Sequence, residues 1–68
     1  AISTKVKAKL FDDNELSGFA ISVDTFEGTV TLTGAVDRPD LKERAGAIAG
    51  SVRGVREVNN LLKIQSAK

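Results

Sequence analysis

Hydrophobic residues return at two different spacings along this chain, and each change of spacing marks a new element. Ile2, Val6 and Leu10 recur at every fourth residue, which is the spacing of one face of a helix. The pattern predicts a helix over about residues 4–11, capped by Ser3 or the following threonine. The chain therefore opens with a short amphipathic helix.

After this helix come residues that favour turns, and after them hydrophobic residues that recur at every second position. Residues 12–18 contain aspartates, asparagine, serine and glycine, which predicts a loop, and we expect Leu16 to anchor it to the core. Apolar and polar residues then alternate over residues 19–24 and again over residues 29–33, which indicates two strands.

The two strands are expected to form a hairpin whose register follows from the alternation. If Val23 lies opposite Leu32, the loop has two or four residues centred on Glu27 and Gly28, and Gly28 supplies a positive φ. One face of the hairpin is then polar, with a single aromatic near its tip. Its members are Ser22, Asp24, Phe26, Thr29, Thr31 and Thr33.

The second half of the chain predicts a helix and a third strand. Pro39 suits the first turn of a helix, which we expect to end near Gly54. Residues 55–64 are rich in β-branched side chains and predict the strand, in which Asn60 either finds partners or marks a bulge. The apolar stripe of the helix comprises Leu41, Ala45, Ile48, Ala49 and Val52.

These elements define an α+β fold with the order α-β-β-α-β in one domain, residues 1–68. We expect two helices packed on one face of a three-stranded mixed sheet, with the third strand parallel to the second and beside it. Gly46 and Gly50 lie four residues apart on the second helix, which favours close packing on the first helix or on a partner.

The composition of the chain excludes the commonest catalytic groups and metal ligands. The 68 residues include no cysteine and no histidine, so thiol nucleophiles, thiolate sites and imidazole bases are absent. The acidic residues 12–15 lack the ligand spacing of a calcium loop, and the glycines do not form a phosphate loop. We therefore expect a protein that is not an enzyme and that holds no cofactor or metal.

Two classes of partner are also disfavoured. No apolar run is long enough to span a membrane, and the start of the chain lacks the pattern of a secretory leader, so we expect a mature protein or an excised domain. Nucleic acid is disfavoured because the chain has no Tyr, Trp or His and no aromatic ladder.

The net charge of +1 is expected to conceal two oppositely charged ends. The predicted topology brings Lys5, Arg53, Arg56 and Phe26 to the hairpin tip, with Lys9 one turn along the first helix. Glu27 and Glu57 partly offset the positive charge of this end. The opposite end gathers Asp12, Asp13, Glu15, Asp37 and Asp40, and Arg38 and Lys63 partly offset its negative charge.

Over nearly its whole length the chain resembles the BON domain family, named from bacterial osmotically inducible and nodulation proteins. The resemblance implies a domain of the bacterial periplasm or outer membrane, linked to osmotic stress, that associates with phospholipid and also occurs in tandem copies. It carries no catalytic motif. The matching segments are Ile21-Ser-Val23, Glu27-Gly28-Thr-Val30-Thr-Leu32-Thr-Gly34-Ala-Val36, Ala45, Ile48-Ala49 and Val52-Arg-Gly54-Val55-Arg-Glu-Val58-Asn59-Asn60.

Three functions remain in view, and the leading hypothesis is a non-catalytic envelope domain that associates with phospholipid surfaces. Each Lys or Arg near an anionic surface adds about 1 kcal/mol to binding, and the expected lipid-binding residues are Lys5, Lys9, Phe26, Arg53 and Arg56. The alternative is a module that binds an envelope protein or a second BON domain through the open sheet face, with Phe26, Thr31 and Leu61. A third is binding of a small ion or osmolyte.

Overall fold

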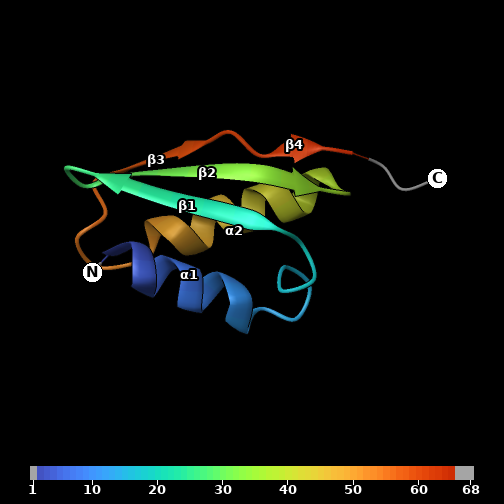
Figure 1. Cartoon of the computed structure of the whole chain (residues 1–68), viewed down its shortest axis with the longest axis horizontal. Coiled ribbons are helices and arrows are strands. Elements are labelled where there is room, and N and C mark those ends of the chain that lie inside the picture. The colour runs from blue at the N-terminus through green and yellow to red at the C-terminus, as the bar shows by residue number, and fades with distance from the viewer. Residues whose placement is uncertain (1, 66–68) are drawn as a thin grey trace.

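The observed order of elements is the one that the hydrophobic spacing predicts. The structure is a computed structural model and describes residues 2–65. The elements are α1 Ile2–Asp12, β1 Ile21–Phe26, β2 Thr29–Val36, α2 Pro39–Gly50, β3 Glu57–Asn60 and β4 Lys63–Ile64. The α-β-β-α-β order is confirmed, with the third strand divided into two short segments (Figure 1).

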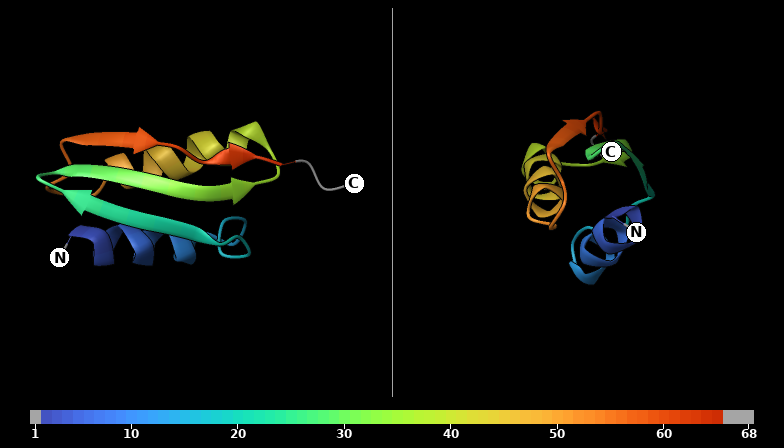
Figure 2. Two further views of the ribbon diagram at one scale, coloured as in Figure 1. Left: turned by 45° about the horizontal axis from the view of Figure 1, so that its top comes forward. Right: turned by 90° about the vertical axis from the view of Figure 1, so that its left-hand side faces the viewer.

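The sheet has β2 at its centre, with β1 on one side and β3 and β4 on the other. β1 pairs antiparallel with β2 and places Val23 opposite Leu32, as predicted. β3 pairs parallel with β2, with Thr29 beside Glu57, which confirms the mixed sheet. Both helices cover the same face of the sheet and leave the other face open (Figure 2).

The last strand keeps a single register although its ladder is interrupted. Thr29 pairs with Glu57 and Ala35 pairs with Lys63, so the offset between the strands is unchanged from β3 to β4. Of the two outcomes expected for Asn60, partners or a bulge, the structure shows partners. The predicted strand over residues 55–64 is therefore shorter and divided, but not bulged.

Asn60 links β3 to α2 through its side-chain amide. Its Nδ2 donates to the carbonyl of Lys42 at 2.8 Å, and its Oδ1 accepts from the amide of Leu62 at 3.2 Å. A Cβ built on Gly46 would lie 2.9 Å from Asn60 Nδ2, and one on Gly50 would lie 3.7 Å from a Val58 methyl. The two glycines therefore let α2 approach β3, and the prediction that they pack on the first helix is wrong.

Both helices differ from their predicted ends for local reasons. α1 begins at Ile2, so Ser3 and the next residue lie inside its first turn and the predicted cap is wrong. α2 begins at Pro39 as expected but ends at Gly50, earlier than predicted. The Ser51 hydroxyl donates to the Ile48 carbonyl at 2.7 Å, which closes the last turn before the chain bends toward β3.

The hairpin loop has two residues, the shorter of the two expected lengths. Gly28 takes the expected positive φ of 84°, and Glu27 also has a positive φ, 50°. Two successive residues of this kind are typical of a type I′ turn, whose twist matches that of the flanking strands.

A single apolar core lies between the helices and the sheet. Leu16 is fully buried and anchors the loop after α1, as predicted. Ile48 of the predicted stripe is only partly buried and packs at the edge of the core. The buried residues are Val6, Leu10, Leu16, Ile21, Val30, Leu32, Val36, Leu41, Ala45, Ala49, Val52 and Leu62.

Gly34 should be the glycine least tolerant of a side chain. It has φ +127°, and a Cβ there would lie 2.3 Å from the backbone oxygen of Ala20. We expect Gly34→Ala to lower the free energy of unfolding by about 2 to 4 kcal/mol, measured by urea denaturation.

Gly18→Ala is the matched control, because nothing lies within 4 Å of a Cβ at Gly18. It should change stability by less than about 0.5 kcal/mol. Equal stability of the two variants would contradict the close approach of the chain at Gly34.

Candidate functional site

Three segments that are distant in sequence meet at one end of the domain, here called the hairpin end. They are the start of α1, the turn between β1 and β2, and the connection from α2 to β3, at the left of Figure 1. The parallel pairing of β3 with β2 causes this arrangement, because it places the start of β3 beside the start of β2. The Arg56 amide donates to the Gly28 carbonyl at 2.8 Å and fixes this meeting point.

The first concavity near this end is the basic groove, which runs between α1 and the segment after α2. Its volume is about 480 Å³. Val52 is 4% exposed and, with Ala8, gives the groove an apolar part between the cationic side chains. The lining residues are Lys5, Ala8, Lys9, Ser51, Val52 and Arg53.

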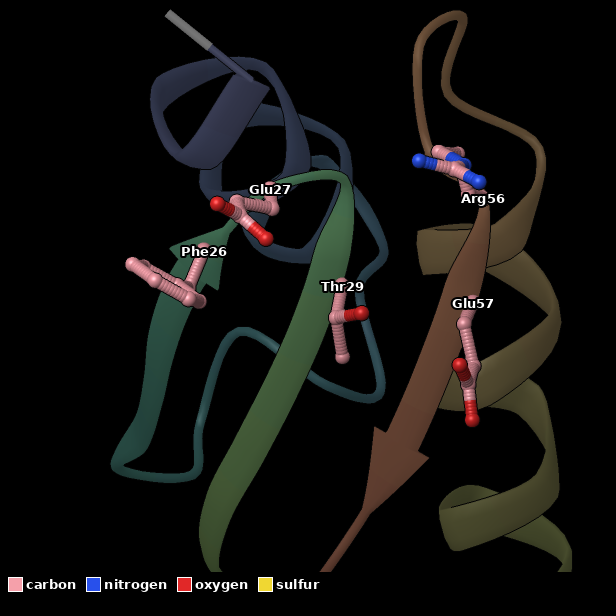
Figure 3. A pocket seen from close by; sticks show the side chains of 5 residues that line it. All are labelled: Phe26, Glu27, Thr29, Arg56 and Glu57. Atoms are coloured by element: carbon pink, nitrogen blue, oxygen red, sulfur yellow. The ribbon is translucent and has the colours of Figure 1, made fainter.

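The second concavity is the tip hollow, of about 350 Å³, on the open face of the sheet (Figure 3). It is lined by Phe26, Glu27, Thr29, Arg56 and Glu57. The residues expected at one basic site are thus divided between two concavities. Lys5, Lys9 and Arg53 share the groove, whereas Phe26 and Arg56 share the hollow with two carboxylates.

Ion pairs differ sharply between the two ends of the domain. At the opposite end, Arg44 Nε lies 2.6 Å from Asp13 Oδ2, and Arg38 Nη2 lies 3.4 Å from Glu15 Oε1. Within residues 2–65, no carboxylate oxygen lies within 4.0 Å of a side-chain nitrogen of Lys5, Lys9, Arg53 or Arg56. The acidic end is therefore partly neutralised, whereas the cations of the hairpin end are available to a ligand.

Asp13 organises the loop after α1, a role that its sequence context alone did not show. Its Oδ1 accepts from the amide of Glu15 at 2.9 Å and from that of Leu16 at 3.3 Å. Burial acts to raise the pKa of Asp13, but the hydrogen bond from Arg44 and those from the two amides outweigh it, so the pKa is lowered. Arg44 is distant in sequence, so only the fold reveals this pair.

The residues expected on the open sheet face lie there, but they differ in exposure. Phe26 is 75% exposed and Leu61 is 52% exposed. Thr31 is half-buried between Asp24 on β1 and Asn59 on β3. The two exposed apolar side chains are therefore the prominent features of this face.

Two further findings concern membranes and metals. None of the helices formed by residues 2–65 has the length and apolar character needed to cross a bilayer. The same residues contain no group of three or more carboxylates positioned to hold a metal ion.

These features define a class of protein: a small α+β domain with two helices on one face of a mixed sheet and a cationic groove at one end. The chain belongs to the BON domain family, whose sequence model matches residues 1–66. The resemblance noted in the sequence is thereby confirmed.

Two known proteins that are similar to this chain are both longer than it. The chain is 40% identical over 63 residues to osmotically-inducible protein Y of Escherichia coli (strain K12), covering 93% of this chain and 31% of that protein. It thus spans about a third of that relative. The C-terminal domain of CdsD, described as the structural protein of the type III secretion system of Chlamydia trachomatis, has a TM-score of 0.75 at 22% identity, covering 94% of this chain and 32% of that one. This second likeness concerns the fold.

Loss of the Asp13 carboxylate should make stability less sensitive to acid. The lowered pKa of Asp13 means that its ionised form stabilises the fold at neutral pH. That contribution begins to fade below the unfolded-state pKa of about 3.9 and is lost as pH falls through the lower folded-state value. Urea midpoints of Asp13→Asn should therefore fall less than those of the unmodified chain between about pH 5 and about pH 2.

Asp12→Asn is the matched control, because Asp12 is exposed and forms no ion pair among the described residues. This variant should follow the pH dependence of the unmodified chain. If Asp13→Asn and Asp12→Asn respond alike, the role assigned to the Asp13 to Arg44 pair is wrong.

Proposed function

We propose that this domain binds phospholipid surfaces of the bacterial cell envelope through its hairpin end. The observation that carries the proposal is the basic groove, where Lys5, Lys9 and Arg53 surround an apolar part and have no carboxylate partner among the described residues. Unpaired cations beside apolar surface suit a lipid interface, where phosphate groups lie above acyl chains.

Phe26 also supports binding through the hairpin end, although it lies outside the basic groove. It is 75% exposed at the tip of the hairpin and lines the hollow across β2 from Arg56. An aromatic ring at this position can enter the interfacial layer while Arg56 and the groove cations contact phosphate. The basic groove and the tip hollow would then contact the same lipid surface, although they are separate concavities.

The envelope location rests on family and relatives. The chain belongs to the BON domain family, and its 40% identical relative is named for osmotic induction. We infer a periplasmic or outer-membrane-associated location and a non-catalytic role in the osmotic-stress response. Three cations give weak binding that salt screens, so a second domain copy or a separate anchor would be needed for stable attachment.

A second candidate is a module that binds an envelope protein or a second BON domain through the open face. The observation that favours it is the exposure of Phe26 and Leu61 on a face that no helix covers. Exposed apolar side chains on a sheet face are a common feature of interaction surfaces. Thr31 would lie beneath the partner, between these two side chains.

Charge reversal in the groove should remove most of the lipid binding. Lys5→Glu combined with Arg53→Glu changes two cations to anions, and we expect at least about tenfold weaker binding to phosphatidylglycerol vesicles at low salt. Sedimentation with vesicles measures this directly. Adding Arg56→Glu should weaken binding further, and raised salt should weaken the unmodified domain.

The control is Lys7→Glu combined with Lys63→Glu, which has the same net charge but changes residues outside the groove. It should bind at least about fivefold better than the groove variant. Equal binding by the two variants would overturn the proposed site. Absence of vesicle binding, together with self-association that Leu61→Asp abolishes, would favour the open-face module.

A further inference from the structure

The tip hollow takes its shape from the register of three strands. Phe26 pairs with Thr29 and Thr29 pairs with Glu57, so the three side chains form one row across the open face. Adjacent strands lie roughly 4.8 Å apart, which separates the backbones at Phe26 and Glu57 by about 10 Å. The short Thr29 side chain between two longer ones leaves a depression wide enough for a small polar group.

Arg56 is held at the rim of this depression by contacts to Gly28. Its amide donates to the Gly28 carbonyl at 2.8 Å, and a Cβ built on Gly28 would lie 2.7 Å from Arg56 Cδ. The aliphatic part of Arg56 therefore lies directly over the glycine. A side chain positioned in this way loses less conformational entropy when its guanidinium binds a ligand.

Charges of both signs surround the hollow without pairing. Figure 3 shows Glu27 and Arg56 on opposite sides of the hollow, with Thr29 on β2 between them. Glu57, the first residue of β3, lies next to Arg56. Among the described residues, no carboxylate oxygen lies within 4.0 Å of an Arg56 side-chain nitrogen. The hollow thus presents one cationic group and two anionic groups, all free to contact a ligand.

We propose that the tip hollow binds a zwitterion, in which an ammonium group is joined by a short linker to a phosphate or carboxylate. The anionic group contacts Arg56, and the ammonium contacts Glu57, with Glu27 and Phe26 at the opposite rim. A simple anion would meet two carboxylates, and a simple cation would meet the guanidinium. A ligand that carries both charges is favoured by the guanidinium and by the carboxylates.

The same chemistry has two sources. One is the phosphoethanolamine headgroup of a lipid, and in that form the inference rests on the proposed function and names the headgroup that the second concavity takes. The other is a free zwitterion in solution, such as phosphoethanolamine or a betaine. The experiment has one arm for each source.

The first arm is a titration of the ¹⁵N-labelled domain with free ligands, followed by amide NMR. O-phosphoethanolamine should give saturable shifts at residues 26–29 and 56–57, with binding at least about fivefold tighter than that of glycerol 3-phosphate or ethanolamine. Glu57→Gln and Arg56→Gln should each weaken binding at least about threefold. Glu43→Gln removes an exposed carboxylate of α2 outside the hollow and should leave binding unchanged.

The second arm compares vesicles of equal phosphatidylglycerol content whose remaining lipid is either phosphatidylethanolamine or digalactosyldiacylglycerol. A preference of at least about threefold for phosphatidylethanolamine, lost in Glu57→Gln, identifies the lipid as the source. Equal binding to both vesicles, together with the NMR result above, identifies the free zwitterion.

The zwitterion site is overturned if phosphoethanolamine gives no saturable shifts, or if Glu57→Gln leaves them unchanged. Failure of the proposed function has a different signature, because neither vesicle composition would then bind the domain. The NMR arm requires no membrane and therefore tests the hollow whether or not the domain binds vesicles.

Discussion

The parallel pairing of β3 with the central strand β2 is the constraint on which the rest of the structure depends. It requires α2 to cross the sheet, so the chain returns to the end from which β2 began. Asn60 and Gly46 maintain the pairing by joining β3 closely to α2. As a consequence, the start of α1, the hairpin turn and the segment after α2 lie at one end, where the groove and the hollow form.

Arginines at one end of the described structure are paired with carboxylates, whereas the cations at the other end are not. Arg38 and Arg44 pair with carboxylates at the end opposite the hairpin, and Asp13 there also fixes the loop that buries Leu16. The cations of the hairpin end have no such partners among the described residues. Small exposed ion pairs add little stability, so the role we propose for this asymmetry is in binding, because unpaired cations can contact phosphate.

Sequence patterning predicted the features that depend on periodicity. The hairpin register follows from alternation, because a shift by one residue would expose Val23 and Leu32. The end of α2 and the division of the last strand involve single hydrogen bonds, those of Ser51 and Asn60, which periodicity does not encode. The separation of Arg56 from the groove and the Asp13 to Arg44 pair arise from tertiary contacts between distant residues, so no local pattern announces them.

The proposed binding of phospholipid through the hairpin end is tested most directly by the orientation of the domain on a bilayer. Paramagnetic broadening of amide signals by nitroxide-labelled lipid in phosphatidylglycerol nanodiscs reports which residues lie next to the headgroups. Binding through the hairpin end predicts strong broadening at Lys5, Gly28 and Arg53, and little at Asp13 and Asp40, at the opposite end. Broadening concentrated at Asp13 and Asp40, or no broadening at all under conditions of low salt, would contradict binding through the hairpin end.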